Sequence, residues 1–287
     1  MASPQVQHFY HQESGTLSYV VSDPATSIAA VIDPVLGFDI VSGHTDHGPL
    51  QAIVAFLRER QLKLQWILET HAHADHLSGA QFIKNSVGGD IAIGAGIRAV
   101  QEHFAKIFNQ ELSAASEAHP FDKLLANDET FTIGELPVRV IPTPGHTSDS
   151  VTYLIGDAAF VGDSLFMPDA GSARCDFPGG DAGVLYDSIQ RLLALPADTR
   201  IFVCHDYQPN GRELRFETSV REQAASNIHI GGGRSREAFI AMREKRDKTL
   251  SLPKLIVPAI QVNIRAGITP PPEDNGVAYL KIPLNSF

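Results

Sequence analysis

Four side chains that bind metals well occur within six residues of this sequence, in the run His71-Ala72-His73-Ala74-Asp75-His76. Imidazole nitrogens and carboxylate oxygens are common protein ligands of zinc and iron. Histidines two residues apart project from one tight loop, and Asp75 and His76 add an oxygen and another nitrogen nearby. The run therefore predicts a site for one or two metal ions, provided that later segments complete the shell. Any one of these residues alone would instead indicate a solvated loop or a helix cap.

Three later residues of the same chemical kind each follow a strand-like segment. His146 lies in Pro142-Thr143-Pro144-Gly145-His146-Thr147, Asp163 lies in Phe160-Val161-Gly162-Asp163-Ser164, and His205 follows the segment Arg200–Cys204. A glycine beside His146 and another beside Asp163 let the backbone turn sharply there. Taken singly, each residue is more typical of a turn. Because metal-ligand types recur at four strand ends of one chain, we interpret them as parts of one metal centre.

The segments that must position these residues alternate between strand and helix patterns. Gly43–Gly48 reads as a polar loop, and Leu252–Phe287 is rich in proline with few long elements. Strands are predicted at Thr16–Ser22, Ser27–Asp33, Leu64–Glu69, Ile91–Ile93, Thr130–Ile133, Val138–Pro142, Ser150–Ile155, Ala158–Val161 and Arg200–Cys204, and helices at Leu50–Arg60 behind Pro49, Ala74–Lys84, Asp181–Leu195 and the charged stretch Glu213–Lys248.

Strands followed by helices, twice over, predict an α/β protein built as a four-layer α/β/β/α sandwich with a C-terminal appendage. We expect residues 1–212 to form the catalytic domain. Residues 213–287 are expected to form a helical and extended appendage that packs on this core.

Composition narrows the class of protein. The chain has 287 residues, of which 43% are hydrophobic and 20% charged, as in ordinary globular proteins. No apolar run approaches the roughly 20 residues of a membrane-spanning helix, and the N-terminus resembles no signal peptide. Two cysteines are too few for a disulfide framework, so we expect a cytoplasmic location and no membrane contact. A formal net charge of -10 argues against a nucleic-acid partner.

The order of the motifs resembles the metallo-β-lactamase superfamily across roughly residues 15–210: the histidine run, then Gly-His-Thr, Gly-Asp and a strand-end histidine. The resemblance implies two metal subsites. One would contain His71, His73 and His146, and the other Asp75, His76 and His205, with Asp163 bridging them.

Further stretches resemble one branch of that superfamily, the persulfide dioxygenases, also called sulfur dioxygenases and related to the ethylmalonic encephalopathy protein. The similar stretches are Gly162–Phe166, Gly171–Gly180 and Cys204–Pro209, while Ile230–Arg236 and Gln261–Gly267 resemble the bacterial form with a longer C-terminus.

This branch implies one Fe(II) per chain, held by His71, His146 and Asp163, with open positions for substrate sulfur and O2. The implied reaction converts glutathione persulfide, O2 and water to glutathione and sulfite. His73, Asp75, His76 and His205 would then orient the ligands through hydrogen bonds.

The residue types do not choose iron over zinc, because every ligand of a binuclear zinc site is also present. The alternative function is therefore a glyoxalase II-like thioester hydrolase. In such an enzyme two zinc ions lower the pKa of a bridging water so that hydroxide forms near neutral pH.

Substrate contacts are expected from cations, since glutathione carries two carboxylates. Arg174 is the first candidate, with an ion pair to Asp176 or Asp181 as the alternative. Tyr207 could hydrogen-bond substrate or pack structurally, and Cys175 could carry sulfur or act as buried filler. Weaker candidates are Arg212 and members of the charged run 234–248, among them Arg234, Arg236, Arg243 and Arg246. Apolar residues in the tail would be compatible with a homodimer.

Overall fold

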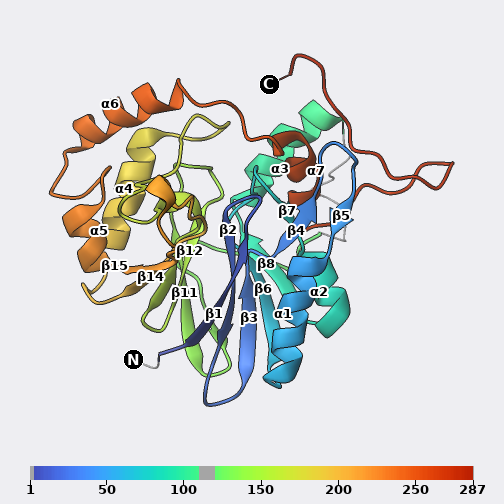
Figure 1. Cartoon of the computed structure of the whole chain (residues 1–287), viewed down its shortest axis with the longest axis horizontal. Helices are drawn as coiled ribbons and strands as arrows, with labels where there is room; N and C mark the ends of the chain where they lie inside the picture. The colour runs from blue at the N-terminus through green and yellow to red at the C-terminus, as the bar shows by residue number, and fades with distance from the viewer. Residues whose placement is uncertain (1–2, 110–119, 287) are drawn as a thin grey trace.

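The computed structural model describes residues 3–109 and 120–286, which form two six-stranded sheets placed face to face with helices on both outer sides (Figure 1). The first sheet has the order β1-β2-β3-β6-β8-β9, and the second has the order β10-β11-β12-β13-β14-β15. The first sheet contains β1 (Gln5–His11), β2 (Thr16–Ser22), β3 (Ile28–Ile32), β6 (Lys63–Glu69), β8 (Asp90–Gly94) and β9 (Lys123–Leu125); the second contains β10 (Thr130–Ile133), β11 (Leu136–Pro142), β12 (Val151–Ile155), β13 (Ala158–Phe160), β14 (Arg200–Phe202) and β15 (Glu217–Ser219).

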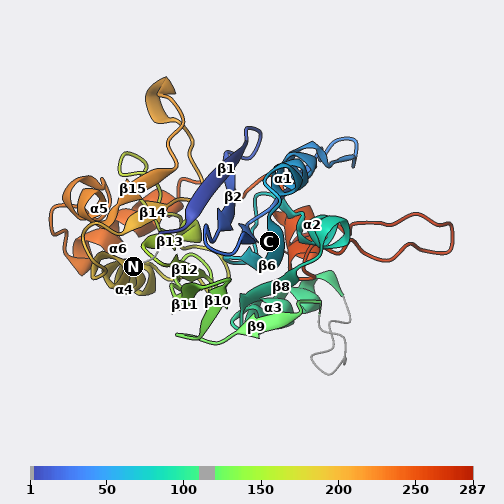
Figure 2. The ribbon, with the colours of Figure 1, turned by 90° about the horizontal axis from the view of Figure 1, so that it is seen from below.

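The side chains of β2 alternate between two buried clusters, which explains why the sheets stack. Leu17, Tyr19 and Val21 are buried in the cluster that also contains the second sheet, whereas Val20 is buried in the cluster beneath the helices of the first sheet. Successive side chains of a strand point to opposite faces, so one apolar strand serves both layers. The predicted four-layer α/β/β/α sandwich is confirmed, and Figure 2 shows the layers edge on.

Helices cover the two outer faces. On the first sheet lie α1 (Gly48–Glu59), α2 (Ala80–Val87), α3 (Ile97–Phe108) and α7 (Ile256–Asn263), and on the second lie α4 (Ala182–Leu193), α5 (Val220–Ser226) and α6 (Arg236–Asp247) (Figure 1). Local signals set several helix starts. Asp181 accepts a hydrogen bond from the Val184 amide at 2.8 Å and caps α4, and Ser235 caps α6 in the same way.

The helix predicted over Ala74–Lys84 is wrong in its first half. Residues 77–78 form the short strand β7 (Leu77–Ser78), which pairs with β4 (Val35–Phe38), and α2 begins only at Ala80. Gly79 makes the turn between them, where any Cβ would collide with Leu50 of α1. The loop that carries the histidines is therefore held by strand pairing and packing. The predicted polar loop Gly43–Gly48 likewise contains a two-residue strand, β5 (Thr45–Asp46).

The single helical stretch predicted over Glu213–Lys248 is also wrong. It contains β15, which closes the edge of the second sheet, and then two separate helices, α5 and α6. A boundary between residues 212 and 213 stays a prediction, but segments on its C-terminal side belong to both outer layers and to one sheet. Within the described ranges, no helix is both long and apolar enough to cross a bilayer.

The packing of Phe239 on α6 allows a test of whether the C-terminal part of the chain unfolds together with the core. Its ring is fully buried, and the ring centroid lies 5.6 Å from that of Tyr186 on α4. We expect Phe239→Ala to lower the free energy of unfolding by about 3–5 kcal/mol, as measured by urea denaturation. The protein should still unfold in one cooperative transition. The surface variant Lys245→Ala is the control. If Phe239→Ala instead showed two unfolding transitions, and only the one at lower urea concentration moved, α6 would unfold independently of the core.

Candidate metal centre

The metal-ligand candidates converge because each follows the end of a strand in one of the two facing sheets. The histidine run follows β6 of the first sheet, whereas His146 follows β11, Asp163 follows β13 and His205 follows β14 of the second sheet. The candidates are buried, apart from the partly exposed Asp75. The site therefore lies where the two sheets meet, and neither half could build it alone.

One group of three consists of His71, His146 and Asp163, whose ligand atoms all lie within 4.8 Å of one another. His146 Nε2 is 3.5 Å from Asp163 Oδ2. Two imidazoles and one carboxylate are thus brought together, and His73 is not a member of this group.

Hydrogen bonds select the free nitrogen of both histidines in this group. His146 Nδ1 lies 2.7 Å from the Arg174 carbonyl oxygen, which can only accept, so Nδ1 carries the proton and Nε2 keeps its lone pair. Thr70 donates its hydroxyl proton to Asp33 Oδ2 at 2.9 Å and lies 3.1 Å from His71 Nδ1. The hydroxyl therefore accepts from Nδ1–H, and His71 Nε2 is left free as a ligand.

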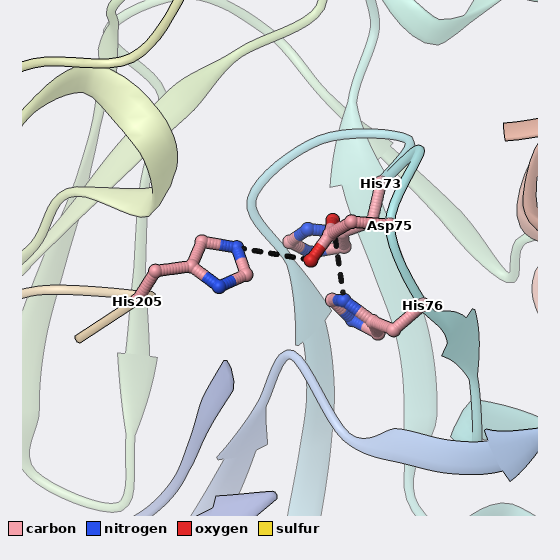
Figure 3. Close-up of side chains that lie close together, drawn as sticks. All are labelled: His73, Asp75, His76 and His205. Atoms are coloured by element: carbon pink, nitrogen blue, oxygen red, sulfur yellow. Dashed lines mark ion pairs between the residues drawn. The ribbon is translucent and has the colours of Figure 1, made fainter. Parts of the chain in front are cut away.

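The second group consists of His73, Asp75, His76 and His205 (Figure 3). His205 Nε2 lies 3.4 Å from Asp75 Oδ2, and His76 Nδ1 lies 3.5 Å from Asp75 Oδ1. His205 Nε2 is also 3.2 Å from Asp163 Oδ1, so Asp163 stands between the two groups with one oxygen toward each.

His73 has a different environment from the other histidines of the run. Its Nε2 is 3.1 Å from Asp33 Oδ1 and 3.8 Å from Glu69 Oε2, and the side chain is fully buried. These two carboxyls lie beside Nε2, whereas Nδ1 makes no hydrogen bond to any described residue and His73 belongs to the second ligand group. His73 therefore packs against a carboxylate pair, while His71 and His146 face Asp163.

Burial perturbs the charges of the cluster. Desolvation raises the pKa of Asp163, Asp33 and Glu69 and lowers the pKa of His71 and His73 well below the usual value. Desolvation would also lower the pKa of His205, but the carboxylates of Asp163, Asp75 and Asp33 together outweigh it and raise the pKa of this histidine.

Several buried ligand atoms make no hydrogen bond to any described residue. They are His71 Nε2, His73 Nδ1 and Nε2, Asp75 Oδ2, His76 Nε2, Asp163 Oδ1 and His205 Nε2. An unpaired buried polar atom costs free energy, and a cation shared by such atoms removes that cost. The donor set of nitrogen and oxygen atoms fits a divalent transition metal.

A cleft of about 630 Å³ leads to this cluster. His146, Asp163 and Asp75 lie in its wall, so the metal centre can be reached from the cleft. Of the predicted substrate residues, Arg174 and Tyr207 line the cleft, whereas Arg212, Arg234 and Arg236 do not.

The guanidinium of Arg174 already has partners. It binds both carboxylate oxygens of Asp176, at 2.6 and 2.7 Å, and the Ser251 carbonyl oxygen at 2.6 Å. Tyr207 stacks parallel to His205 with ring centroids 5.6 Å apart. Both residues therefore shape the wall of the cleft whatever else they bind.

The remaining predicted residues lie in structural contacts. Arg212 bonds the carboxylates of Asp169 and Asp206, Arg236 pairs with Asp187, and Arg234 donates to the Ile228 carbonyl. Cys175 is buried and outside the cleft wall. Burial and the nearby Asp247 raise the pKa of its thiol, which disfavours the thiolate.

Sequence reasoning missed residues that the fold brings to the site. Asp33 follows β3 as the ligands follow their strands, so its place after a strand was an available signal. Lys254 and His229 line the cleft from the tail, and no local pattern marked them. Arg246, a member of the charged run, also lines the cleft. Neither Arg246 nor Lys254 has an ion-pair partner among the residues described.

His229 is a buried neutral histidine in the cleft wall. The Ser172 amide donates to its Nδ1 at 2.9 Å, so Nδ1 is unprotonated and the proton of the neutral ring lies on Nε2. Burial, followed by the positive charges of Arg243, Arg246 and Arg234, lowers the pKa of His229 to about 4.

Comparisons with known proteins place the chain among related sequences and structures. The model of the metallo-beta-lactamase superfamily matches residues 13–205. A probable metallo-hydrolase of Burkholderia pseudomallei is 46% identical over 98% of this chain and 99% of its own length. Glyoxylase B2 of Dictyostelium discoideum is 47% identical over 98% of this chain and 97% of its own length.

Persulfide dioxygenases are more distant in sequence but similar in structure. The mitochondrial persulfide dioxygenase ETHE1 of Mus musculus is 27% identical over 93% of this chain and 90% of its own length. The crystal structure of ETHE1 from Myxococcus xanthus superposes with a TM-score of 0.73 and 30% identity, covering 92% of this chain and all of that one.

The neutral state of His229 predicts a pH effect on stability. Between pH 6.5 and about 4, the unfolded chain binds a proton at this residue and the folded chain does not, so stability falls as the pH is lowered. We expect His229→Asn to reduce the loss of unfolding free energy between pH 7 and pH 5 by about 2 kcal/mol. Urea denaturation at both pH values measures this. An unchanged pH dependence in the variant would contradict the assignment.

Proposed function

The chain belongs to the metallo-β-lactamase superfamily, and we propose that within it the protein is an iron-dependent persulfide dioxygenase. The observation that carries this proposal is the composition of the group at the cleft. His71, His146 and Asp163 stand together, while His73 belongs to the other ligand group and has its Nε2 3.1 Å from Asp33 Oδ1. Two histidines and one carboxylate on one side of a metal are the typical ligands of non-haem Fe(II) oxygenases.

The reaction proposed joins glutathione persulfide, O2 and water to give glutathione, sulfite and two protons. The outer sulfur of the persulfide gains three oxygen atoms, which equal the two of O2 and the one of water. Fe(II), when bound, supplies the redox-active centre at which the sulfur and O2 react. His71, His146 and Asp163 would hold it and leave the remaining positions open toward the cleft.

The chain's own residues prepare this site in three ways. The Arg174 carbonyl and the Thr70 hydroxyl keep the Nδ1 protons of His146 and His71 away from the metal side. Phe166 and Phe177 line the cleft beside the ligands and limit the entry of water. Arg246 and Lys254, which have no carboxylate partner among the described residues, are the cations available to the carboxylates of glutathione.

A binuclear zinc thioester hydrolase is the second candidate, and one observation favours it. His73, Asp75, His76 and His205 form a second ligand group, and Asp163 presents an oxygen to each group. Such an arrangement suits a pair of metal ions that activates a water between them. The name of the Dictyostelium relative, glyoxylase B2, points the same way.

Two further features accompany the proposal. Cys175 and Cys204 are unpaired and buried, which agrees with a cytoplasmic protein. The extended segment after α7 projects beyond the helices at the right of Figure 2 and exposes Val277, Tyr279, Ile282 and Leu284, which would support a homodimer.

Metal analysis with oxygen uptake separates the two candidate functions. Protein purified anaerobically with Fe(II) is expected to hold about one iron per chain and to consume O2 with glutathione persulfide. His71→Ala, His146→Ala and Asp163→Ala should each lower iron content at least tenfold, because each removes a ligand. Two zinc ions per chain with thioester cleavage and no oxygen uptake would replace the dioxygenase with the hydrolase.

Arg246 and Lys245 form a matched pair of variants for substrate binding. Both are exposed cations of α6, but only Arg246 lines the cleft. Arg246→Ala is expected to raise KM for glutathione persulfide about tenfold with kcat little changed, because a charge-assisted contact in the ground state is lost. Lys245→Ala should leave both constants as they are. Equal effects of the two variants would remove Arg246 from the substrate site.

A further inference from the structure

The backbone of the histidine loop is attached to the C-terminal part of the chain through one side chain. Asn263, the last residue of α7, donates from Nδ2 to the carbonyl oxygens of His73 and His76, each at 2.8 Å. Its Oδ1 accepts from the Ser78 amide at 2.7 Å. The side chain is almost completely buried. Both donors and the acceptor of this one carboxamide are thus used by the loop.

The hydrogen bonds from Asn263 take the place of the backbone hydrogen bonds that a helix or a strand would provide. Residues 71–76 belong to no helix or strand, so their buried carbonyls need donors from elsewhere. Within the described parts of the chain, the carbonyl oxygens of His73 and His76 accept a hydrogen bond from the Asn263 amide alone. Since His73 and His76 carry their imidazoles on the same loop, fixing both carbonyls also fixes the directions in which those rings leave the backbone.

The end of α7 is itself held against the loop. Gln101 of α3 donates from Nε2 to the Ile264 carbonyl at 2.8 Å. Gly267 follows with a φ of +82°, and a Cβ there would lie 2.9 Å from the Ser78 carbonyl oxygen. The segment Asn263–Gly267 therefore approaches the loop too closely to move without disturbing it.

We propose that Asn263 is a positioning residue of the metal centre: it sets the backbone of the histidine loop and thereby the affinity for the metal ion. The inference rests on the proposed metal centre but not on which reaction occurs there. It applies equally to one iron or two zinc ions, so its test can be separated from the test of the dioxygenase.

Two substitutions of Asn263 remove its hydrogen bonds to the loop to different degrees. Asn263→Ala leaves two carbonyls and one amide without partners. Asn263→Asp is nearly the same shape and keeps an acceptor for the Ser78 amide, but it places an oxygen against the His73 and His76 carbonyls. Loss of a residue that orients ligands typically weakens metal binding about 10–100-fold. We expect that loss in both variants, measured with Fe(II) and with Zn(II) by competition against a chelator.

Gln261 provides the matched control. It lies on the same helix and is equally buried, but its side chain bonds the Lys281 amide and carbonyl at 2.9 Å and the Val257 carbonyl, not the loop. Gln261→Ala is expected to lower the melting temperature and to leave metal affinity unchanged. A fall in metal affinity as large as that of Asn263→Asp would mean that general destabilisation explains the result, and would overturn the proposal.

A measurement on metal-free protein gives an independent readout. Hydrogen exchange of the amides of residues 73–78 should speed up at least tenfold in Asn263→Asp, since the His73 and His76 carbonyls lose the donor that holds the loop. Amides of β6 and β8 should exchange as in the unaltered protein. If metal affinity and loop exchange are both unchanged in Asn263→Asp, or if exchange rises equally throughout the first sheet, the positioning role is wrong.

Discussion

The structure depends on one constraint: imidazoles and carboxylates are buried together at the junction of two sheets with ligand atoms that no described residue satisfies. Burying such groups is unfavourable unless they are paired or bound to a cation. The surrounding fold therefore has to keep these polar side chains in place, although hydration and charge repulsion favour their separation. Strand ends in both sheets, the hydroxyls of Thr70 and Thr16, and the Arg174 carbonyl all serve that purpose.

The histidines of the loop are divided between two ligand groups. His71 stands with His146 and Asp163, whereas His73 stands with Asp75, His76 and His205 and directs its Nε2 toward Asp33 and Glu69. The ring centroids of His71 and His73 lie only 4.0 Å apart, so these two histidines supply one imidazole to each of two adjacent ligand groups. The two imidazoles and one carboxylate of the first group are what lead us to propose a mononuclear iron centre, whereas the second group is what would hold another ion in the binuclear alternative.

Much of the architecture was predictable because its signals are local. The strands that end at the histidine run and before His146, Asp163 and His205 are rich in apolar and β-branched residues, and their order indicates the sandwich. The start of α2 at Ala80 was not predictable, because the pairing of β7 with β4 decides it. The orientation of His73 and the contacts of Arg174 also depend on partners distant in sequence, and so no spacing rule reveals them. Predicted substrate contacts from Arg212, Arg234 and Arg236 rested on charge alone, and these residues lie outside the cleft wall.

The attachment of Asn263 has a consequence for biosynthesis. Translation delivers His76 of the histidine loop 187 residues before Asn263, whose side chain supports that loop. A nascent polypeptide that has formed the first sheet still lacks both the second sheet and α7, so its ligand loop lacks His146, Asp163, His205 and the Asn263 carboxamide. All candidate ligands, and the side chain that supports their loop, are therefore present together only after both sheets have been synthesised.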